Sequence, residues 1–402
     1  MKKAVMLGLV LVGSSAQAQS LQLYGLVDAG VSHMSGLRGG SVNQINSGIM
    51  EGSRWGLRGR EDLGGGYQAI FTLESRVELD TGTSTNRPVT GTQLPDRVST
   101  PAALGLPDTP VTRATVTAIG AQLANTEFGV NIPGRLFDRQ AFVGLITPFG
   151  AFLAGRQYTP AFEVAAQFDI FNLATAASPQ QLVAFPTGVD IRLSNSAAYR
   201  IEKNGFTGSI VAAASEDSTV TGRFIGAGGM YKSDRFAAGL AYNTRNNELG
   251  DKSLTNTVAG ASLNLGSGTF STEINLIKDD NPSGLSAVPA APLNFRGAFF
   301  NALRQDARLF HIGYRHMFGA NSLALGYNHL DDKRPSNADV ASYGAAYTYV
   351  LSKRTDLTAA VAHLDNKERG QLALGGNGYL GGVSERAGQD VNSVSFSIRH
   401  RF

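Results

Sequence analysis

Apolar and polar residues alternate along most of the chain after Leu21, in segments of about ten residues that end in turn-forming residues. The last segment has Val394, Phe396, Ile398 and His400 on one face, and Ser395, Ser397, Arg399 and Arg401 on the other. Successive side chains of a strand point to opposite faces, so the pattern predicts β-strands with one apolar and one polar face. Segments with a 3.6-residue period, typical of helices, are almost absent.

The connections between the predicted strands are alternately short and long. The short turns are Glu61 to Gly66, Thr147 to Phe149, Glu202 to Gly205, Lys232 to Arg235, Gly266 to Gly268, Phe318 to Asn321 and Ser352 to Thr355. The longer connections fall at about residues 35–51, 80–135, 157–189, 215–220, 245–253, 279–305, 331–337 and 365–389. Seven turns and eight loops give fifteen connections, so the sequence predicts sixteen strands.

Sixteen antiparallel strands with tight turns at one end and long loops at the other are typical of a transmembrane β-barrel of the outer membrane. A soluble β-sandwich also alternates, but it does not need loops on one side only, and it has edge strands to protect. A closed barrel pairs every backbone group, as lipid requires. We therefore predict an all-β fold, a 16-stranded antiparallel barrel.

The N-terminus predicts export. Lys2 and Lys3 precede an apolar run from Ala4 to Val12, and Ala16-Gln17-Ala18 fits a cleavage site. The run is about half the length that a membrane-spanning helix needs. We interpret residues 1–18 as a cleaved signal peptide and residues 19–402 as a single barrel domain.

Composition excludes several functions. Lys and Arg number 35 against 32 Asp and Glu, and removal of Lys2 and Lys3 lowers the formal net charge from +3 to +1, with no basic run that would suit a nucleic acid. The chain has no cysteine, so thiolate metal sites and cysteine nucleophiles are absent. None of the six histidines falls in a catalytic motif and no G-x-S-x-G is present, so we expect neither an enzyme nor a cofactor.

Four motifs resemble Gram-negative general porins, particularly those of betaproteobacteria. They are Leu23-Tyr24-Gly25-Leu26-Val27-Asp28-Ala29-Gly30, then Ser53-Arg54-Trp55-Gly56-Leu57-Arg58-Gly59 followed by Glu61-Asp62-Leu63-Gly64-Gly65-Gly66, Gly155-Arg156-Gln157-Tyr158-Thr159-Pro160, and Arg399-His400-Arg401-Phe402. The resemblance implies a homotrimer whose third loop folds into the lumen and forms the constriction. Residues 157–189 are the candidate for that loop, since long ordered loops are usually functional.

In the family that this chain resembles, a row of wall arginines faces acidic residues of the third loop. By motif, the arginines are Arg54, Arg139 and Arg192, with Arg156 at the root of the loop. Alternation places Arg54 and Arg58 on the polar face of their strand. A cation on the lipid face near the bilayer midplane would cost about 2–4 kcal/mol, so these side chains should point into the lumen.

The acidic side of the predicted constriction is weaker. The Pro-Glu-Phe-Gly loop signature is absent, and Leu26 stands where enteric relatives carry a lysine. The available loop carboxylates are Glu163, Asp169 and, at the exit, Asp190, with Glu163 the first choice. A net positive constriction predicts passive diffusion of small hydrophilic solutes with a modest anion preference. The alternative is a substrate-selective channel for organic anions or sugars, suggested by Tyr158 and Phe162.

Three further features bear on partners. Phe402, with Ile398 and Phe396 at alternate positions before it, resembles the terminal signal that the barrel-assembly machinery recognises. Outer-membrane lipid and lipopolysaccharide should surround the barrel, and Asp331-Asp332 could bind Ca²⁺, although paired loop acids are more often only solvated. Residues 80–135 could latch onto a neighbouring subunit, be partly mobile, or hold an extra hairpin over Arg113 to Ile119.

Overall fold

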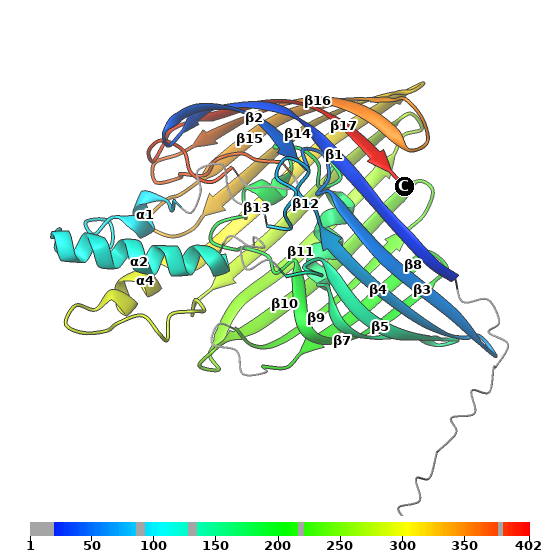
Figure 1. Cartoon of the computed structure of the whole chain (residues 1–402), viewed down its shortest axis with the longest axis horizontal. Coiled ribbons are helices and arrows are strands. Elements are labelled where there is room, and N and C mark those ends of the chain that lie inside the picture. The colour runs from blue at the N-terminus through cyan, green and yellow to red at the C-terminus, as the bar shows by residue number, and fades with distance from the viewer. Residues whose placement is uncertain (1–19, 86–92, 128–134, 216–220, 377–380) are drawn as a thin grey trace, which may run out of the picture.

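The computed structural model describes residues 20–85, 93–127, 135–215, 221–376 and 381–402, so the predicted signal peptide and most of the loop at 215–220 lie outside the described residues. Its strands form one antiparallel sheet that closes on itself, because β1 pairs with β17 as well as with β2 and β3. Figure 1 shows the resulting barrel. The first eight strands are β1 (Ser20–Leu37), β2 (Gly40–Ser47), β3 (Arg54–Gly64), β4 (Tyr67–Arg76), β5 (Gln140–Thr147), β6 (Gly150–Tyr158), β7 (Arg192–Lys203) and β8 (Phe206–Ala213). The others are β9 (Thr221–Lys232), β10 (Phe236–Asn247), β11 (Lys252–Asn264), β12 (Gly268–Asp279), β13 (Gln305–Phe318), β14 (Asn321–Asp332), β15 (Val340–Val350), β16 (Thr355–Asn366) and β17 (Val391–Arg401).

The predicted barrel of sixteen strands is confirmed, and the second strand is split into β2 and β3. Both halves pair with β1, and residues 48–53 interrupt them. The Asp28 carboxylate accepts the backbone N–H groups of Met50 and Glu51 at 2.8 Å each, which replaces ladder bonds lost at the interruption. The predicted long connection at 35–51 is wrong, because β2 occupies residues 40–47 within it. Gly39 and Gly40, both with φ near +100°, allow a tight turn between β1 and β2.

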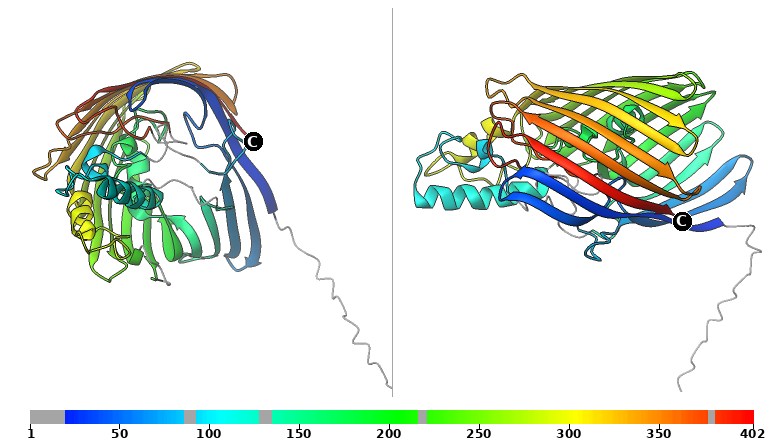
Figure 2. Two further views of the ribbon diagram at one scale, coloured as in Figure 1. Left: turned by 60° about the vertical axis from the view of Figure 1, so that its left-hand side comes forward. Right: turned by 90° about the horizontal axis from the view of Figure 1, so that it is seen from above.

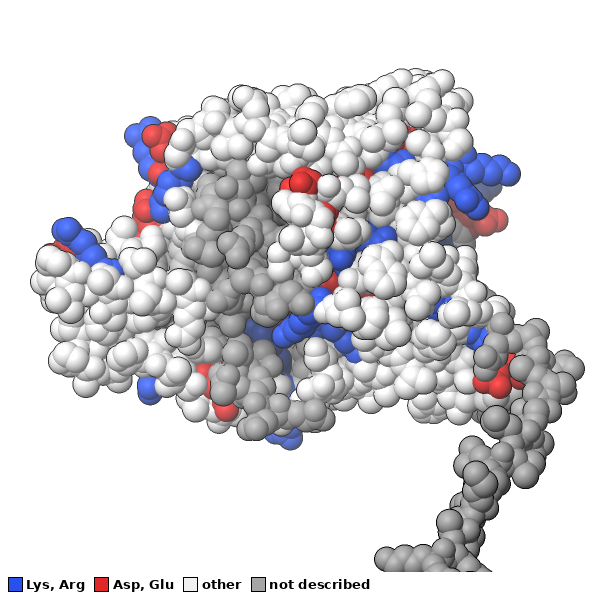
Figure 3. Space-filling view, viewed as in Figure 1, with Lys and Arg blue, Asp and Glu red and all other residues white. Residues whose placement is uncertain are grey.

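The predicted alternation in the last strand is confirmed. Val394, Phe396 and Ile398 are about half exposed on the outer face, whereas Ser393, Ser395 and Ser397 are buried on the inner face. Charged atoms gather at the ends of the barrel and in the recess between them, and most of the outer wall between is uncharged (Figure 3). This band is the surface that lipid would cover.

Long segments and helices gather at one end of the barrel (Figure 1). These helices are α1 (Asp96–Ser99), α2 (Pro110–Glu127) and α4 (Phe295–Leu303). The hairpin considered for Arg113 to Ile119 is wrong, because α2 runs through it. Its buried residues Thr112, Val116, Ile119 and Leu123 follow helical spacing, a period that the interleaved Ala and Thr residues hide. No helix among the described residues is long and apolar enough to cross a membrane.

Residues 159–191, between β6 and β7, fold into the barrel as predicted, and we call them the inward loop. They contain α3 (Pro160–Phe168) and the short helix η1 (Pro179–Gln181). The Thr159 hydroxyl accepts the backbone N–H of Phe162, and Pro160 fits the first helical position, so the local sequence starts α3 there. Figure 2 shows α3 inside the barrel, against the strands drawn in green.

The wall beneath the inward loop has a row of glycines at the points of closest approach. These six residues, which we call the glycine belt, are Gly228, Gly239, Gly260, Gly313, Gly326 and Gly344 on β9, β10, β11, β13, β14 and β15. A Cβ added to any of them would lie within about 3 Å of Pro160, Phe168, Ile170, Phe171 or Ala177. Only glycine lets the loop approach the strands this closely.

Polar wall side chains bind the backbone of the inward loop. Asn328 Nδ2 donates to the Ala177 carbonyl at 2.9 Å, and Ser271 Oγ donates to the Phe168 carbonyl at 2.6 Å. The Ile170 N–H donates to His311 Nε2 at 3.1 Å. These bonds satisfy a loop backbone that lies outside any sheet.

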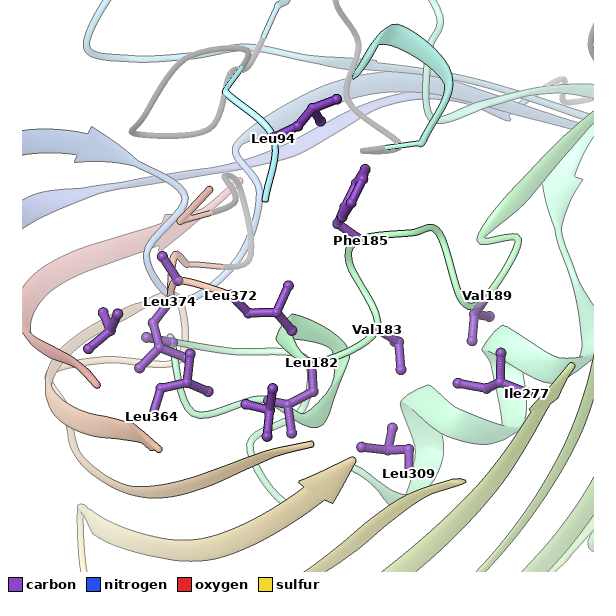
Figure 4. Packing of buried hydrophobic residues seen from close by; sticks show 14 of the residues in the cluster. Leu94, Leu182, Val183, Phe185, Val189, Ile277, Leu309, Leu364, Leu372 and Leu374 are labelled. Atoms are coloured by element: carbon purple, nitrogen blue, oxygen red, sulfur yellow. The ribbon is translucent and has the colours of Figure 1, made fainter. Parts of the chain in front are cut away.

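A second segment between β16 and β17, described at residues 367–376 and 381–390, also folds inward. Its Leu372 and Leu374 are buried against the inward loop and the wall. Figure 4 shows this cluster, which we call the apolar plug. Its labelled residues are Leu94, Leu182, Val183, Phe185, Val189, Ile277, Leu309, Leu364, Leu372 and Leu374.

Candidate functional site

The wall opposite the packed loop carries a cluster of arginines. Four of them, which we call the arginine wall, are Arg54 on β3, Arg76 on β4, Arg139 before β5 and Arg192 on β7. Arg54 lies 2.9 Å from Glu51 and 3.6 Å from Glu74. Arg139 donates from Nε to Glu74 at 2.7 Å and from a terminal nitrogen to the Tyr158 hydroxyl at 3.1 Å. The structure thus brings together all three arginines that the family motifs indicate.

Arg192 differs from its neighbours because no carboxylate of the described residues lies within 4 Å of it. It donates to the Tyr158 hydroxyl at 3.0 Å, and its guanidinium lies 4.7 Å from the centre of the Tyr158 ring. The tyrosine orients this cation by a hydrogen bond and a cation–π contact without neutralising its charge. Arg192 therefore contributes a full positive charge to the wall.

Arg76 was not among the predicted residues. It pairs in register with Arg54 and lies 3.3 Å from Glu78 and 3.5 Å from Asp138. Arg76 lies two residues after Glu74 on the same strand, so the alternation of side chains could have placed Arg76 on the inner face. Burial raises the pKa of Glu78 to about 7 despite the neighbouring Arg76. One carboxylate of the wall is therefore only partly ionised at neutral pH.

Arg58 and Arg156 lie at the margins of the cluster. The Arg58 guanidinium lies 4.2 Å from the centre of the Tyr24 ring, and the Tyr24 hydroxyl donates to Glu74 at 3.1 Å. Arg156 donates to the Asp138 carbonyl at 2.6 Å and to Ser194 Oγ at 2.9 Å. In the part of the chain that the structure describes, neither forms an ion pair, so both add positive charge.

The predicted loop acids do not bond to the arginine wall. Glu163 pairs with Arg200 on β7, beneath α3. Asp190 lies 3.2 Å from Arg245 on β10, at the exit of the loop. Both acids therefore attach the loop to the barrel wall.

Asp169 is fully enclosed within the inward loop. It accepts the backbone N–H groups of Phe171 at 2.8 Å and Leu173 at 3.0 Å, and the Ser178 hydroxyl at 2.7 Å. Burial raises the pKa of this carboxyl above its ordinary value. Asp169 thus organises the turn that follows α3.

The remaining surface of the inward loop is uncharged. All residues from 159 to 191 are described, and the exposed ones are Gln167 and Asn172. The exposed side chains of the loop are therefore amides, whereas the arginine wall carries guanidinium groups. Low-dielectric barrel walls focus such a field into the lumen, which favours anions.

The second inward segment was missed by the sequence prediction. Gln181 of the inward loop donates to the Gly376 carbonyl at 3.0 Å and accepts the Gly375 N–H at 3.1 Å. The apolar residues Leu372 and Leu374 within a glycine-rich loop are the signal that could have found it.

Among the described residues, no group of three or more His, Asp or Glu could hold a metal ion.

Comparison with known proteins agrees with this geometry. Residues 4–369 match the family model described as Gram-negative porin. The chain is 27% identical over 427 residues to outer membrane porin protein 32 of Delftia acidovorans, covering 100% of both chains. It is 36% identical over 101 residues to an outer membrane porin of Bordetella pertussis, covering 21% of this chain and 26% of that one.

Two solved structures extend the comparison. The anion-selective porin from Comamonas acidovorans superposes with a TM-score of 0.70 at 25% identity, covering 96% of this chain and 100% of that chain. OmpT, an outer membrane protein of Vibrio cholerae, superposes with a TM-score of 0.60 at 12% identity, covering 98% of this chain and 100% of that chain, which speaks to the fold alone.

Proposed function

This chain belongs to the Gram-negative porin family and forms a channel in the bacterial outer membrane, and we propose that the arginine wall gives this channel a modest preference for anions. The observation that carries the proposal is the unequal lumen. Arg192 has no carboxylate partner among the described residues, and the loop surface across from it has no charged side chain exposed. The similarity to an anion-selective porin supports the same sign of selectivity.

The constriction acts by electrostatics and size, without chemical catalysis. Arg54, Arg139 and Arg192 raise the local concentration of anions, while the inward loop and the apolar plug narrow the water-filled path. Arg58 and Arg156 extend the positive field along the wall. Glu163 and Asp169 contribute by holding the inward loop in place.

Planar bilayer recording in a salt gradient tests this proposal. The reversal potential of the wild-type channel should have the sign of anion preference, and the double variant Arg54→Gln, Arg192→Gln should shift it toward cations. Arg113, which is exposed on α2 and paired with Asp108, offers a control charge far from the wall. No shift in the double variant would overturn the assignment.

A selective channel for organic anions or sugars is the second candidate. The stacked rings of Tyr158 and Phe162, 5.3 Å apart, lie beside Arg139 and Arg192 and favour it. A selective channel would show saturable block of ion current by its substrate. A general porin would pass neutral and anionic solutes according to size.

We further propose that residues 1–18 are removed as a signal peptide, that residues 19–402 form the mature barrel, and that three copies assemble as a homotrimer. Phe402, Phe396 and Ile398 are exposed at the closing strand, which suits recognition by the barrel-assembly machinery. Lipid and lipopolysaccharide would cover the uncharged outer band. Conductance steps in groups of three would support the trimer.

A further inference from the structure

A pocket lies beneath α3, toward the end of the barrel that carries the short turns. Its volume is about 730 Å³, within the roughly 300–1,000 Å³ that is typical of sites for small molecules. It is lined by the turn at residues 147–150, by the N-terminal half of α3, and by residues of β7, β8 and β9. The four residues of the arginine wall, all of which the structure describes, are not among its lining residues, so the pocket is a separate site.

The pocket presents an ion pair whose two charges both remain accessible. Glu163 of α3 pairs with Arg200 of β7, and their side chains are 24% and 28% exposed. Arg200 also donates to the Tyr158 carbonyl at 3.4 Å, which helps to fix the position of its guanidinium. A ligand with a single charge would be attracted by one member of this pair and repelled by the other. A ligand with one positive and one negative group can be attracted by both.

The charges that line the pocket also balance in number. They are Glu163, Arg200, Glu202 and Lys203, two of each sign. The pocket therefore differs from the arginine wall, where positive charge is in excess. Charge complementarity at such a site favours a ligand that carries both signs.

The rest of the lining is largely apolar. Ile146 of β5, Val164 of α3 and Met230 of β9 all contribute to it. Burial of an apolar group against these side chains removes apolar surface from water on both sides, and methionine adapts its shape to what it contacts. An apolar surface with a few charged groups at one place is the usual composition of a small-molecule site.

We propose that this pocket binds a free amino acid with an apolar side chain, such as leucine, at the end of its path through the channel. Its carboxylate would lie toward Arg200 and its ammonium group toward Glu163. Its side chain would pack against Ile146, Val164 and Met230. The proposal requires the water-filled channel, but it does not depend on the anion preference proposed above, because the arginine wall takes no part in the pocket.

Planar bilayer recording with four ligands tests this chemistry. Leucine, added at the side of the short turns, should interrupt the ion current in a saturable way. 4-Methylpentanoate lacks the ammonium group, 3-methylbutylamine lacks the carboxylate and glycine lacks the apolar side chain. Each of these three should need at least about a tenfold higher concentration for the same block. An equal block by 4-methylpentanoate would show that only the negative charge matters, and it would overturn the proposal.

A pair of variants locates the block. Met230→Gln makes the apolar lining polar with little change in side-chain length, and it should raise the leucine concentration needed for half block about tenfold. Met317→Gln is the matched control, since Met317 is 59% exposed and lies outside the pocket, and it should leave the block unchanged. No leucine block in the wild type, or an unchanged block in Met230→Gln, would overturn the proposal.

The same channels separate this proposal from the one on selectivity. The reversal potential of the wild type, measured in a salt gradient without leucine, tests the arginine wall alone. A wild-type channel without anion preference that is still blocked by leucine would contradict only the earlier proposal. If Met230→Gln does not fold, the four ligands on the wild type decide.

Discussion

The two sides of the lumen differ in the side chains that their strands carry. On the side of β3 to β7, the strands carry arginines whose charges remain partly uncompensated and face the water-filled path. On the side of β9 to β15, the strands carry glycines and polar side chains that are covered by the inward loop. In the function that we propose, the arginine wall sets the electrostatic field and the opposite wall positions the loop that narrows the path.

The difference also explains where acidic residues can lie. Glu163 pairs with Arg200 on β7 and Asp190 pairs with Arg245 on β10, so the loop uses these carboxylates for attachment to the wall. Because these acids are already paired, they do not neutralise the charges of the arginine wall. We therefore propose that the selectivity of the pore follows from the arginine wall alone.

The largest effect should come from breaking the most buried ion pair of the arginine wall. Arg139→Gln leaves Glu74 buried without one of its cations, and removing one partner of a buried pair typically costs about 3–5 kcal/mol. The temperature at which the barrel unfolds should fall clearly below that of the wild type. Arg113→Gln, at an exposed pair, should leave the unfolding temperature close to that of the wild type. Equal effects of the two variants would contradict the account.

The next effect should come from the glycine belt. In Gly260→Ala the new methyl group would overlap the Phe168 ring, and such overpacking typically costs about 1–3 kcal/mol. We expect lower stability and an altered single-channel conductance, because α3 must move. Gly229→Ala on β9, where an added Cβ has only an ordinary contact at 3.7 Å, should behave like the wild type. An unchanged conductance in Gly260→Ala would argue against close packing of the loop.

A smaller effect should follow pH. Burial raises the pKa of Glu78 to about 7, so its carboxyl ionises as pH rises through that value and adds a negative charge beside Arg76. Between about pH 6 and about pH 8 the anion preference should decrease. The stability contributed by neutral Glu78 is complete below the ordinary pKa of 4.5 and should be lost as pH rises from there through about 7. Glu78→Gln should remove this part of the pH dependence of the reversal potential. A Glu78→Gln channel with the full pH dependence would contradict the assignment to this residue.

The smallest effect on the open channel should come from the C-terminus. Phe402 exchanges backbone hydrogen bonds with Gly25 across the seam that closes the barrel, at 3.0 and 3.1 Å. Deletion of Phe402 should lower the yield of assembled barrels, measured by their resistance to unfolding on gels. The barrels that do form should keep the wild-type conductance, and a changed conductance would show that the residue also shapes the pore.

The features that could be predicted follow from the local sequence pattern, that is, from alternation and from short motifs. The strand from Val391 to Arg401 alternates over its whole length, and each arginine that the motifs indicate lies in the predicted cluster. The interruption of the second strand could not be predicted, because it depends on the Asp28 carboxylate, which is distant in sequence. The inward fold of the segment that begins at residue 367 likewise depends on Gln181, which bonds to Gly375 and Gly376 and lies almost two hundred residues earlier.

The most direct test of the account compares the two sides of the lumen by charge. The reversal potentials of Arg192→Gln and Glu163→Gln should be measured in the same salt gradient and at the same pH as the wild type. We expect a clear shift toward cations for Arg192→Gln and little change for Glu163→Gln. A shift of equal size and opposite sign in Glu163→Gln would contradict the claim that one wall sets the selectivity.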